Sequence, residues 1–187
     1  MNFAAFPATD LGAPPPAAAL AAAAAGSSKH LAFTVTPQEQ DQWCWAAVSS
    51  SVSLFFNAAS PWTQCQVATD ELQFACCGAD ATGPCNRWWY LNRALTRTGN
   101  LLDFTQGAMS GDEVLAAVEA DAPLGVRVEW SDQSGHFICI SGIDLGGAEP
   151  MVTVTDPIYG GSVLPISALT DAYQQSGRWT HSYTTQA

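Results

Sequence analysis

Three residues that lie far apart in the chain are of the types that together carry out nucleophilic acyl chemistry. Cys44 stands at the start of a segment with helical periodicity, His136 opens an apolar run, and Asp156 follows the next such run. A thiol becomes a strong nucleophile when a base takes its proton, and that base needs a third group to orient it. The sequence therefore presents Cys44 as candidate nucleophile, His136 as candidate base and Asp156 as candidate orienting acid.

The surroundings of Cys44 favour a reactive thiol over a packing residue. A helix is predicted over residues 43–57, so Cys44 occupies its first turn, where the helix N-terminus favours a thiolate. A lone cysteine is by default a small buried apolar residue. Here, however, Trp43 and Trp45 flank the cysteine, and Gln38 lies six positions upstream.

His136 and Asp156 are predicted to meet at one end of a sheet. The strand that begins at His136 and the strand that ends before Asp156 are separated by a turn-like segment, residues 144–150, which favours antiparallel neighbours. Cys139, three positions after His136, faces the opposite side of a regular strand and is expected in the core. Two other histidines lie near the ends of the folded part: His30 and His181.

The residues around these three candidates resemble a known family. The string Gln38-x5-Cys44-Trp45-Ala46 resembles the active-site segment of papain-like cysteine proteases, and Gly135-His136-Phe137 resembles that family's histidine strand. The order Cys, His, Asp is the order of the family, and the match covers most of residues 37–160. The cysteine pattern looks closest to a compact bacterial branch that includes a plant-pathogen effector protease.

The resemblance implies a role for Gln38 and a fold for the chain. In this family the upstream glutamine supplies an oxyanion-hole amide, so Gln38 is the expected donor beside the backbone N–H of Cys44. No metal and no organic cofactor is implied, because side chains and backbone supply every group. The sequence departs from the papain pattern in three ways: the Cys-Gly-Ser-Cys-Trp string is absent, Cys44 and His136 are 92 residues apart, and the third member is Asp.

The order of the predicted elements indicates an α+β fold, with an N-terminal helical part and a long central helix packed on a C-terminal antiparallel β-sheet. Helices are predicted over 43–57, 63–72, 86–98 and from Ser110 to about Asp121, with Ser110 and Glu113 as a capping box. Strands are predicted over 31–35, 124–130, 136–143, 151–155, 162–164 and 179–183.

The first 29 residues differ in composition from the rest. Residues 1–29 combine a proline triplet with an alanine-rich run and are interpreted as an Ala/Pro-rich disordered tail or pro-segment, and residues 30–187 as one papain-like peptidase domain. A disordered export segment and a linker are the other interpretations of the tail. It lacks the basic start of a standard signal peptide. No run is long and apolar enough to span a membrane.

Four cysteines gather in a 21-residue window: Cys65, Cys76, Cys77 and Cys85. An even number in a short chain favours two disulfides and an oxidising compartment, whereas free buried thiols and a zinc site remain alternatives. The adjacent pair Cys76-Cys77 does not fit a CxxC…CxxC zinc pattern. Three pairings are possible, and the cysteines together with the family resemblance indicate a secreted or exported bacterial protein.

The charge of the chain limits its partners. Seventeen acidic side chains against six basic ones give a net charge of −11, with no basic stripe to hold a nucleic acid. We expect a monomer that acts on a protein or peptide substrate, without nucleic-acid or membrane partners. Four residues are candidates for the substrate cleft: Trp43, Trp45, Trp130 and Gly135. The run Trp88-Trp89-Tyr90 is expected to be helical and to face the core.

The predicted function is that of a thiol endopeptidase that hydrolyses peptide bonds through an acyl-enzyme at Cys44. A deamidase, a transglutaminase or a peptidoglycan amide hydrolase is the alternative, because the same triad serves each of these reactions. A catalytically silent binding module is a third hypothesis, under which Cys44 reacts with alkylating agents as slowly as an ordinary buried thiol.

Overall fold

The computed structural model describes residues 27–78 and 83–187. Within these ranges the helices are α2 (Cys44–Phe56), α3 (Gln64–Leu72), α4 (Leu91–Thr98), α5 (Gly111–Glu119) and α6 (Ile166–Ala172), with the short 3₁₀ turn η1 (Gly83–Cys85). The strands are β1 (Ser28–His30), β2 (Leu101–Gln106), β3 (Leu124–Glu129), β4 (Gly135–Asp144), β5 (Met151–Asp156), β6 (Gly160–Pro165) and β7 (Arg178–Thr185). No helix in the described part of the chain has the length and apolar character needed to cross a membrane.

The strands form one antiparallel sheet in the order β2-β7-β3-β4-β5-β6. β4 is the longest strand and forms its centre. Its first half pairs with β3, its last residues pair with β1 on the same side, and β5 lies along its other side. The pairing of β4 with β5 confirms the predicted antiparallel neighbours, so the start of β4 and the end of β5 lie at one end of the sheet.

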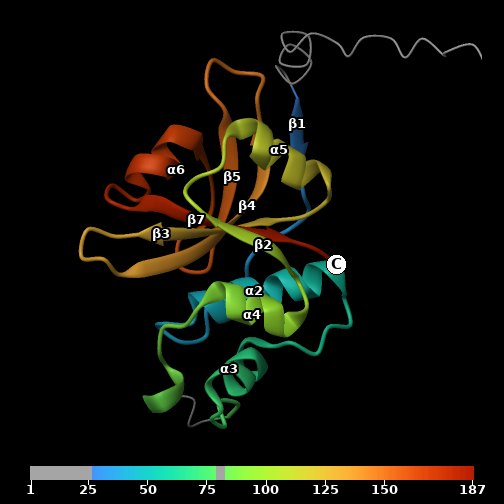
Figure 1. Ribbon diagram of the computed structural model, residues 1–187, viewed down its shortest axis with the longest axis vertical. Coiled ribbons are helices and arrows are strands. Elements are labelled where there is room, and N and C mark those ends of the chain that lie inside the picture. The colour runs from blue at the N-terminus through green and yellow to red at the C-terminus, as the bar shows by residue number, and fades with distance from the viewer. Residues whose placement is uncertain (1–26, 79–82) are drawn as a thin grey trace, which may run out of the picture.

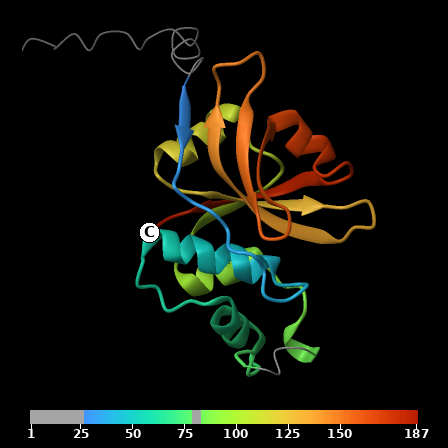
Figure 2. The same cartoon turned by 180° about the vertical axis from the view of Figure 1, so that it is seen from behind.

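Helices cover both faces of the sheet. Figures 1 and 2 show α2, α3 and α4 stacked on one side of it, whereas α5 and α6 lie toward the other. The alternation of β4 explains the two layers: Phe137 and Cys139 join the core with the first three helices, whereas Ile138 and Ile140 join the core with α5 and α6. Cys139 is fully buried, as predicted.

Helix α2 lies in the centre of the helical layer, and almost every side chain from Cys44 to Ser53 is buried. A helix surrounded on all sides by protein must satisfy its polar side chains internally. Ser49 does so by donating its hydroxyl to the carbonyl of Trp45 at 2.9 Å. The helix therefore has little freedom to move, and it delivers Cys44 at its N-terminus to a fixed place beside the sheet.

The predicted helices of the first half are largely confirmed, with one correction. α2, α3 and α5 agree with the predicted ranges, and the capping box of Ser110 with Glu113 opens α5. The predicted helix 86–98 starts only at Leu91, because residues 86–90 run as an irregular segment that bonds to the start of α2 instead of to itself.

The strand predictions need three corrections. Residues 31–35 are not a strand, because the chain leaves the sheet after β1 and crosses to the helical layer, where Phe33 and Val35 become buried. The first strand comes earlier, so Ser28 and Lys29, assigned to the tail by composition, pair with β4. Residues 1–26 of that tail lie outside the described residues. β2 and α6 were not predicted.

Candidate active site

Cys44 is the first residue of α2, and its side chain is 8% exposed. The residue before it, Trp43, has non-helical backbone angles, and the Trp43 N–H donates to the carbonyl of Gln40. A tight turn therefore leads into the helix. Because Cys44 is in the first turn, its backbone N–H has no acceptor within the helix and points toward the N-terminal end. This is the local geometry predicted for a nucleophilic thiol.

The sheet brings His136 and Asp156 together. Nε2 of His136 lies 2.9 Å from Oδ1 of Asp156, and the two residues are only 4% and 2% exposed. The Cys44 side chain lies close enough to the same imidazole to raise the pKa of His136. Since Nε2 faces Asp156, Nδ1 is the ring nitrogen left for the thiol. The three residues predicted from the sequence thus stand in one line of contacts.

In the His136–Asp156 pair, hydrogen bonds and opposite charges together outweigh the effect of burial on the two pKa values. Burial lowers the pKa of His136, but the hydrogen bonds to Asp156 and Cys44 and the attraction of their negative charges outweigh it and raise the pKa to about 9. Burial raises the pKa of Asp156, but the hydrogen bond and charge of His136 and the two following backbone N–H groups hold it below its ordinary value. The pair is therefore an imidazolium beside a carboxylate at neutral pH.

The carboxylate of Asp156 is held from four directions. Its Oδ1 accepts hydrogen bonds from the backbone N–H groups of Ile158 and Tyr159 at 2.6 and 2.9 Å, besides the bond to His136. Its Oδ2 accepts from the hydroxyl of Tyr173 at 2.8 Å. The turn that follows β5 and a residue at the end of α6 therefore fix the carboxylate of Asp156. Such buried, charged hydrogen bonds are strong and directional.

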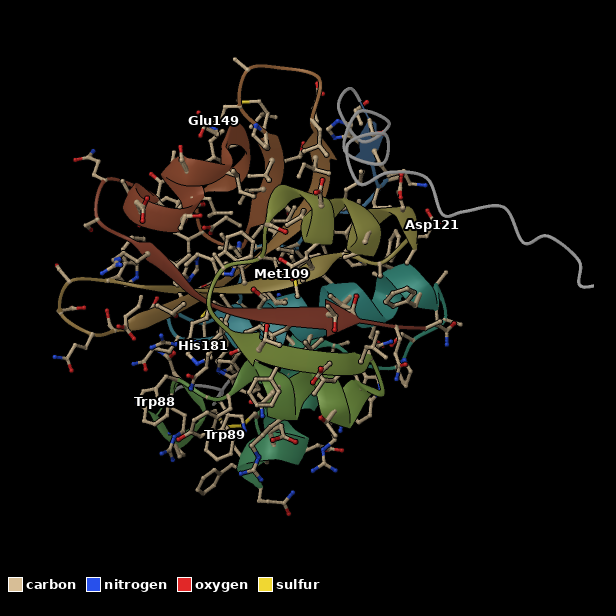
Figure 3. The ribbon with its side chains drawn as sticks, turned by 45° about the horizontal axis from the view of Figure 1, so that its top comes forward. Trp88, Trp89, Met109, Asp121, Glu149 and His181 are labelled. Atoms are coloured by element: carbon tan, nitrogen blue, oxygen red, sulfur yellow. A yellow bond between two sulfur atoms is a disulfide. The ribbon has the colours of Figure 1, made fainter. Side chains whose placement is uncertain are left out.

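A cleft of about 970 Å³ opens over Cys44 and His136. The helical layer and the segment before α4 contribute one wall: Asp41, Gln42, Trp88, Trp89, Tyr90 and Asn92. The sheet contributes the other, which includes Phe104, Trp130, Gly135, Tyr159, His181 and Tyr183. In Figure 3, Trp88, Trp89 and His181 lie on the same side of the molecule. Eight of the twenty residues that line the cleft are Trp, Tyr or Phe.

A known protein family matches most of the chain. The family described as papain-like cysteine protease AvrRpt2 matches residues 27–167 of this chain. The chain belongs to this family. It is therefore a papain-like cysteine peptidase by descent, and the matched range contains Cys44, His136 and Asp156.

Other comparisons are more distant. Among solved structures, the Pseudomonas avirulence protein AvrPphB aligns with a TM-score of 0.39 and 13% identity, covering 83% of this chain and 98% of that one. No curated protein matches the sequence.

Membership in the papain-like family directs attention to Gln38, the expected oxyanion donor. Its Nε2 donates to the carbonyls of Gln40 and Asp41 at 2.9 and 2.6 Å, and its Oε1 is buried without a partner among the described residues. Gln38 holds the turn that leads to Cys44 and is not among the residues that line the cleft. The Gln38 amide must therefore break its hydrogen bond to one of these two carbonyls before it can donate to an oxyanion.

The two tryptophans beside Cys44 are in the core and do not line the cleft as the sequence suggested. Trp43 and Trp45 are both fully buried. The indole N–H of Trp43 donates to the carbonyl of Cys85 at 2.6 Å, and that of Trp45 to the carbonyl of Arg87 at 3.0 Å. A large ring with one polar atom suits this place, because it fills the core and still finds an acceptor.

The 85–90 segment is therefore attached to the start of α2 along its length. Gln42 adds two further links: its N–H donates to Oδ1 of Asn86, and its Oε1 accepts from the N–H of Trp88, each at 3.0 Å. These bonds turn Trp88 and Tyr90 outward, where they are 62% and 50% exposed and line the cleft. The prediction that this run faces the core is wrong for Trp88 and Tyr90, because the segment is not helical, whereas Trp89 is half-buried and packs against the core of the helical layer.

The four clustered cysteines form two disulfides, Cys65–Cys77 and Cys76–Cys85. Both lie in the helical layer, and the second reaches the start of the 85–90 segment. Cys44 and Cys139 are free. The described residues contain no group of three or more His, Cys, Asp or Glu side chains arranged to hold a metal ion.

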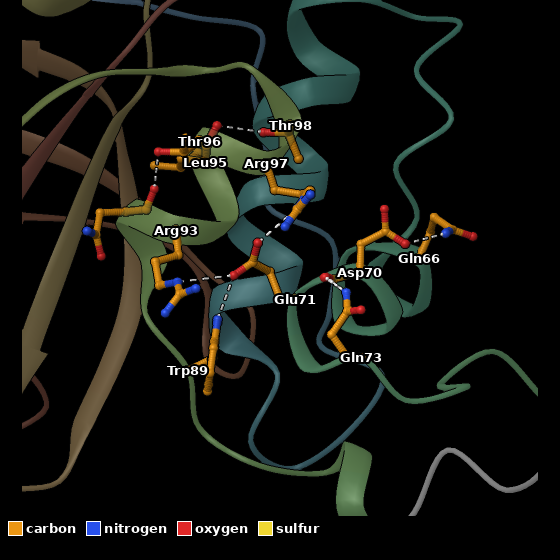
Figure 4. Close-up of polar contacts among 11 residues, drawn as sticks. Gln66, Asp70, Glu71, Gln73, Trp89, Arg93, Leu95, Thr96, Arg97 and Thr98 are labelled. Carbon is orange, nitrogen blue, oxygen red and sulfur yellow. Dashed lines mark hydrogen bonds and ion pairs between the residues drawn. The ribbon is translucent and has the colours of Figure 1, made fainter.

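Sequence reasoning missed Glu71, which supports the helical wall of the cleft. Glu71 is a buried carboxylate on α3 that accepts from the indole N–H of Trp89 at 2.8 Å and from Nε of Arg97 at 2.9 Å, with Arg93 at 3.6 Å (Figure 4). The guanidinium of Arg93 also lies 5.2 Å from the centre of the Trp89 ring. Arg93 and Arg97 are four residues apart on a helix, which was a visible sign of a shared acidic partner.

Tyr159 and Tyr173 were also missed. Tyr159 meets the His136 ring edge-on with centroids 6.3 Å apart, and its N–H binds Asp156. Its position three residues after Asp156 in a turn sequence was the available signal. No signal in the sequence pointed to Tyr173, because it follows a helix that was not predicted. Trp130 and Gly135, by contrast, line the cleft.

Proposed function

We propose that the chain is a thiol endopeptidase that hydrolyses peptide bonds in protein substrates through an acyl-enzyme at Cys44. The observation that carries the proposal is the contact of Cys44, in the first turn of α2, with the buried His136–Asp156 pair at the base of a large cleft. Family membership supports the reaction class, since the family consists of papain-like cysteine proteases.

In the proposed acylation step, the Cys44 thiolate attacks the carbonyl carbon of the substrate and a carbon–sulfur bond forms. His136 enters this step as an imidazolium, which its raised pKa of about 9 permits at neutral pH. It gives a proton to the leaving amine nitrogen as the carbon–nitrogen bond breaks. The products are a thioester on Cys44, a free amine and a neutral imidazole.

Deacylation returns the site to its starting state. A water molecule attacks the thioester carbon while the neutral imidazole of His136 takes its proton. The carbon–sulfur bond breaks, the acid product leaves, and the thiolate and imidazolium are restored. Asp156 keeps the ring oriented in both steps by holding Nε2–H, and it stabilises the positive charge of the imidazolium without itself being protonated.

The negative oxygen that forms in each step needs two donors. The backbone N–H of Cys44 is the first, because it is an unpaired donor at the positive end of α2. The Gln38 amide is the proposed second donor, after exchange of its bond to Gln40 or Asp41 for one to the substrate. The turn at 39–42 is therefore expected to adjust when substrate binds.

The first experiment is mass spectrometry after treatment with a peptidyl epoxide thiol inhibitor, applied to the wild type and to His136→Ala. A single adduct on Cys44 that disappears in the variant supports an activated Cys–His pair. No adduct, or equal labelling of both proteins, contradicts the triad and favours a silent binding module. The second free cysteine, Cys139, is fully buried and serves as an internal control, because it should remain unlabelled.

A second assay separates peptidase from amidase chemistry. A peptide library analysed for new N-termini reports endopeptidase cleavage, and the same peptides analysed for released ammonia report deamidation of glutamine. The size of the cleft and its two aromatic walls favour an extended chain over a single side-chain amide. We also infer export from the producing cell, which the two disulfides support because such bonds persist in oxidising compartments.

A further inference from the structure

Asp156 receives a hydrogen bond from a residue that the proposed reaction does not use. Oδ1 of Asp156 is occupied by His136 and by two backbone N–H groups, and Oδ2 accepts from the hydroxyl of Tyr173 at 2.8 Å. Tyr173 is 1% exposed, and Asp156 is 2% exposed. A buried carboxylate oxygen without a donor is costly, so the hydroxyl completes the shell of the orienting acid.

The backbone of Tyr173 is fixed by the turn that joins α6 to β7. Its N–H and carbonyl both bond to Gly177 at 2.8 Å, which closes a short loop. Gln174 and Gln175 in that loop have φ of 47° and 79°, in the left-handed region that non-glycine residues rarely adopt. A side chain at Gly177 would clash with Trp130 and Val128. Such a conformation persists only where its surroundings determine it.

The indole of Trp130 connects Tyr173 to His136 on the other side. Its ring is stacked on His136 at an interplanar angle of 21° and on Tyr173 at 27°, with centroids 6.4 Å apart in each pair. One rigid ring thus braces both the base and the tyrosine. Asp156 forms hydrogen bonds with the same two residues, His136 and Tyr173. The four side chains form a closed ring of contacts that leaves the carboxylate a single orientation.

We propose that Tyr173 is a positioning residue of the active site, whose hydroxyl holds the Asp156 carboxylate so that Oδ1 faces Nε2 of His136. This inference rests on the proposed function and extends its machinery. Burial, together with the charge and hydrogen bond of Asp156, raises the pKa of Tyr173, so the hydroxyl keeps its proton and remains a donor. The family match ends at residue 167, so Tyr173 lies beyond the matched range.

The test is Tyr173→Phe, which keeps the ring and removes only the hydroxyl. Thr170→Val is the matched control, because Thr170 lies on the same helix and its hydroxyl bonds only within that helix, to the carbonyl of Ile166. We expect kcat of Tyr173→Phe to fall about tenfold, in the range usual for groups that orient a site residue. KM should stay within about twofold, because Tyr173 is not among the residues lining the cleft. Thr170→Val should retain both values.

Proton NMR supplies a readout that a merely structural role would not change. The Nε2 proton of His136, buried in its bond to Asp156, should give a downfield resonance in the wild type. In Tyr173→Phe this resonance should shift or disappear, while the thermal midpoint changes no more than in the control. Wild-type kcat, or a fall in kcat with an unchanged resonance, would overturn the proposal.

A double-mutant cycle asks whether Tyr173 acts through Asp156. The rate of Cys44 alkylation by iodoacetamide is measured in the wild type, in Tyr173→Phe, in Asp156→Asn and in the double variant. We expect the tyrosine change to add less than about twofold once Asp156 is replaced. Independent, multiplying effects would contradict the inference. If the wild type cleaves no peptide, the peptidase function fails, but the resonance and the cycle still decide the role of Tyr173, because neither needs substrate turnover.

Discussion

The helical layer and the sheet hold their parts of the site in different ways. In the sheet, His136 and Asp156 come from two paired strands, and the antiparallel pairing, which has one register shift between Ile140 and Gly142, brings them to one end. In the helical layer, Cys44 depends on α2 and on an irregular segment, 85–90. This segment is joined to the start of α2 by side-chain hydrogen bonds and, through one disulfide, to Cys76 in the loop after α3. Backbone pairing between strands positions the residues of the sheet, whereas side-chain hydrogen bonds and a disulfide position those of the helical layer.

This difference indicates which property of the site a substitution in each region should change. His136 and Asp156 are assembled within the sheet, and Tyr173 at the end of α6 is the helical residue that supports Asp156. Cys44, the proposed nucleophile, belongs to the other layer, so its distance from His136 depends on how α2 is held. Catalysis of this kind requires the reacting groups within a fraction of an ångström. We therefore expect changes in the sheet to affect the acid–base chemistry and changes in the helical layer to affect approach and binding.

The largest expected effect comes from the two free cysteines, one in each region. Cys44→Ala should lower kcat/KM by at least about a thousandfold, because no nucleophile remains. Cys139→Ala should retain activity, because Cys139 is a buried core residue of β4, and should only lower the thermal midpoint through the small cavity it leaves. Peptide hydrolysis and differential scanning calorimetry measure the two properties. Comparable loss of activity in both variants would contradict the assignment of the nucleophile.

The pH dependence should report the sheet side of the site. His136 has a pKa raised from 6.5 to about 9, so the imidazolium and the stability it contributes are fully present below about pH 6.5 and are lost as pH rises through about 9. Asp156 has a lowered pKa, so its contribution is present above the ordinary range of aspartate and is lost as pH falls through the lowered value. Wild-type kcat/KM should therefore decline above about pH 9.

Asp156→Asn should shift that limit in a defined direction. The amide still accepts from Nε2 of His136 but carries no charge, so the pKa of His136 should fall and the alkaline decline should begin at lower pH. We expect kcat/KM at neutral pH to fall about a hundredfold, a smaller loss than removal of the nucleophile. The measurement is a pH–rate profile of both proteins. An alkaline limb that stays in place would show that Asp156 does not control the imidazole.

These two regions also differ in how far the sequence predicts them. The proximity of Cys44, His136 and Asp156 was predictable because each stands at the boundary of a strongly patterned element, and strand alternation placed Cys139 in the core. The 85–90 segment was not predictable from local pattern. Its conformation depends on bonds to residues more than forty positions earlier, which override the helical tendency of Trp88-Trp89-Tyr90.

The pairing of the cysteines lay outside sequence reasoning for the same reason. Cys76 and Cys77 are adjacent but join different partners, and only the packing of α3 against η1 decides which. Trp43 and Trp45 were assigned to the cleft because they flank the nucleophile. On a helix that is buried on all sides, however, neighbours in sequence point into protein rather than toward the substrate.

The disulfides offer the next test of the comparison, because they are similar in loop length but not in position. Their sequence separations are 12 and 9, so chain entropy gives each about 3 kcal/mol. Removing Cys76–Cys85 by paired alanines should lower kcat about fivefold, because the Cys85 carbonyl accepts from Trp43 beside the nucleophile.

Removing Cys65–Cys77 is the matched control. It should lower the thermal midpoint by a similar amount while leaving kcat within about twofold, because neither cysteine bonds to the start of α2. Circular dichroism and peptide hydrolysis on the two paired variants make the comparison. Equal losses of kcat would mean that the 85–90 segment does not hold Cys44 and that the disulfides serve stability alone.

The smallest effect should come from replacing Glu71, which supports the cleft wall without contacting Cys44, His136 or Asp156. Glu71→Gln keeps one acceptor but replaces the other oxygen with a donor, so either Trp89 or Arg97 loses its bond. Since Trp89 lines the cleft, KM should rise about threefold with kcat nearly unchanged. Asp70→Asn, on the same helix and bonded to Gln66, is the control and should leave both values unchanged. A fall in kcat with constant KM would place the effect on the nucleophile instead, and would mean that the helical layer transmits strain to Cys44 as a unit.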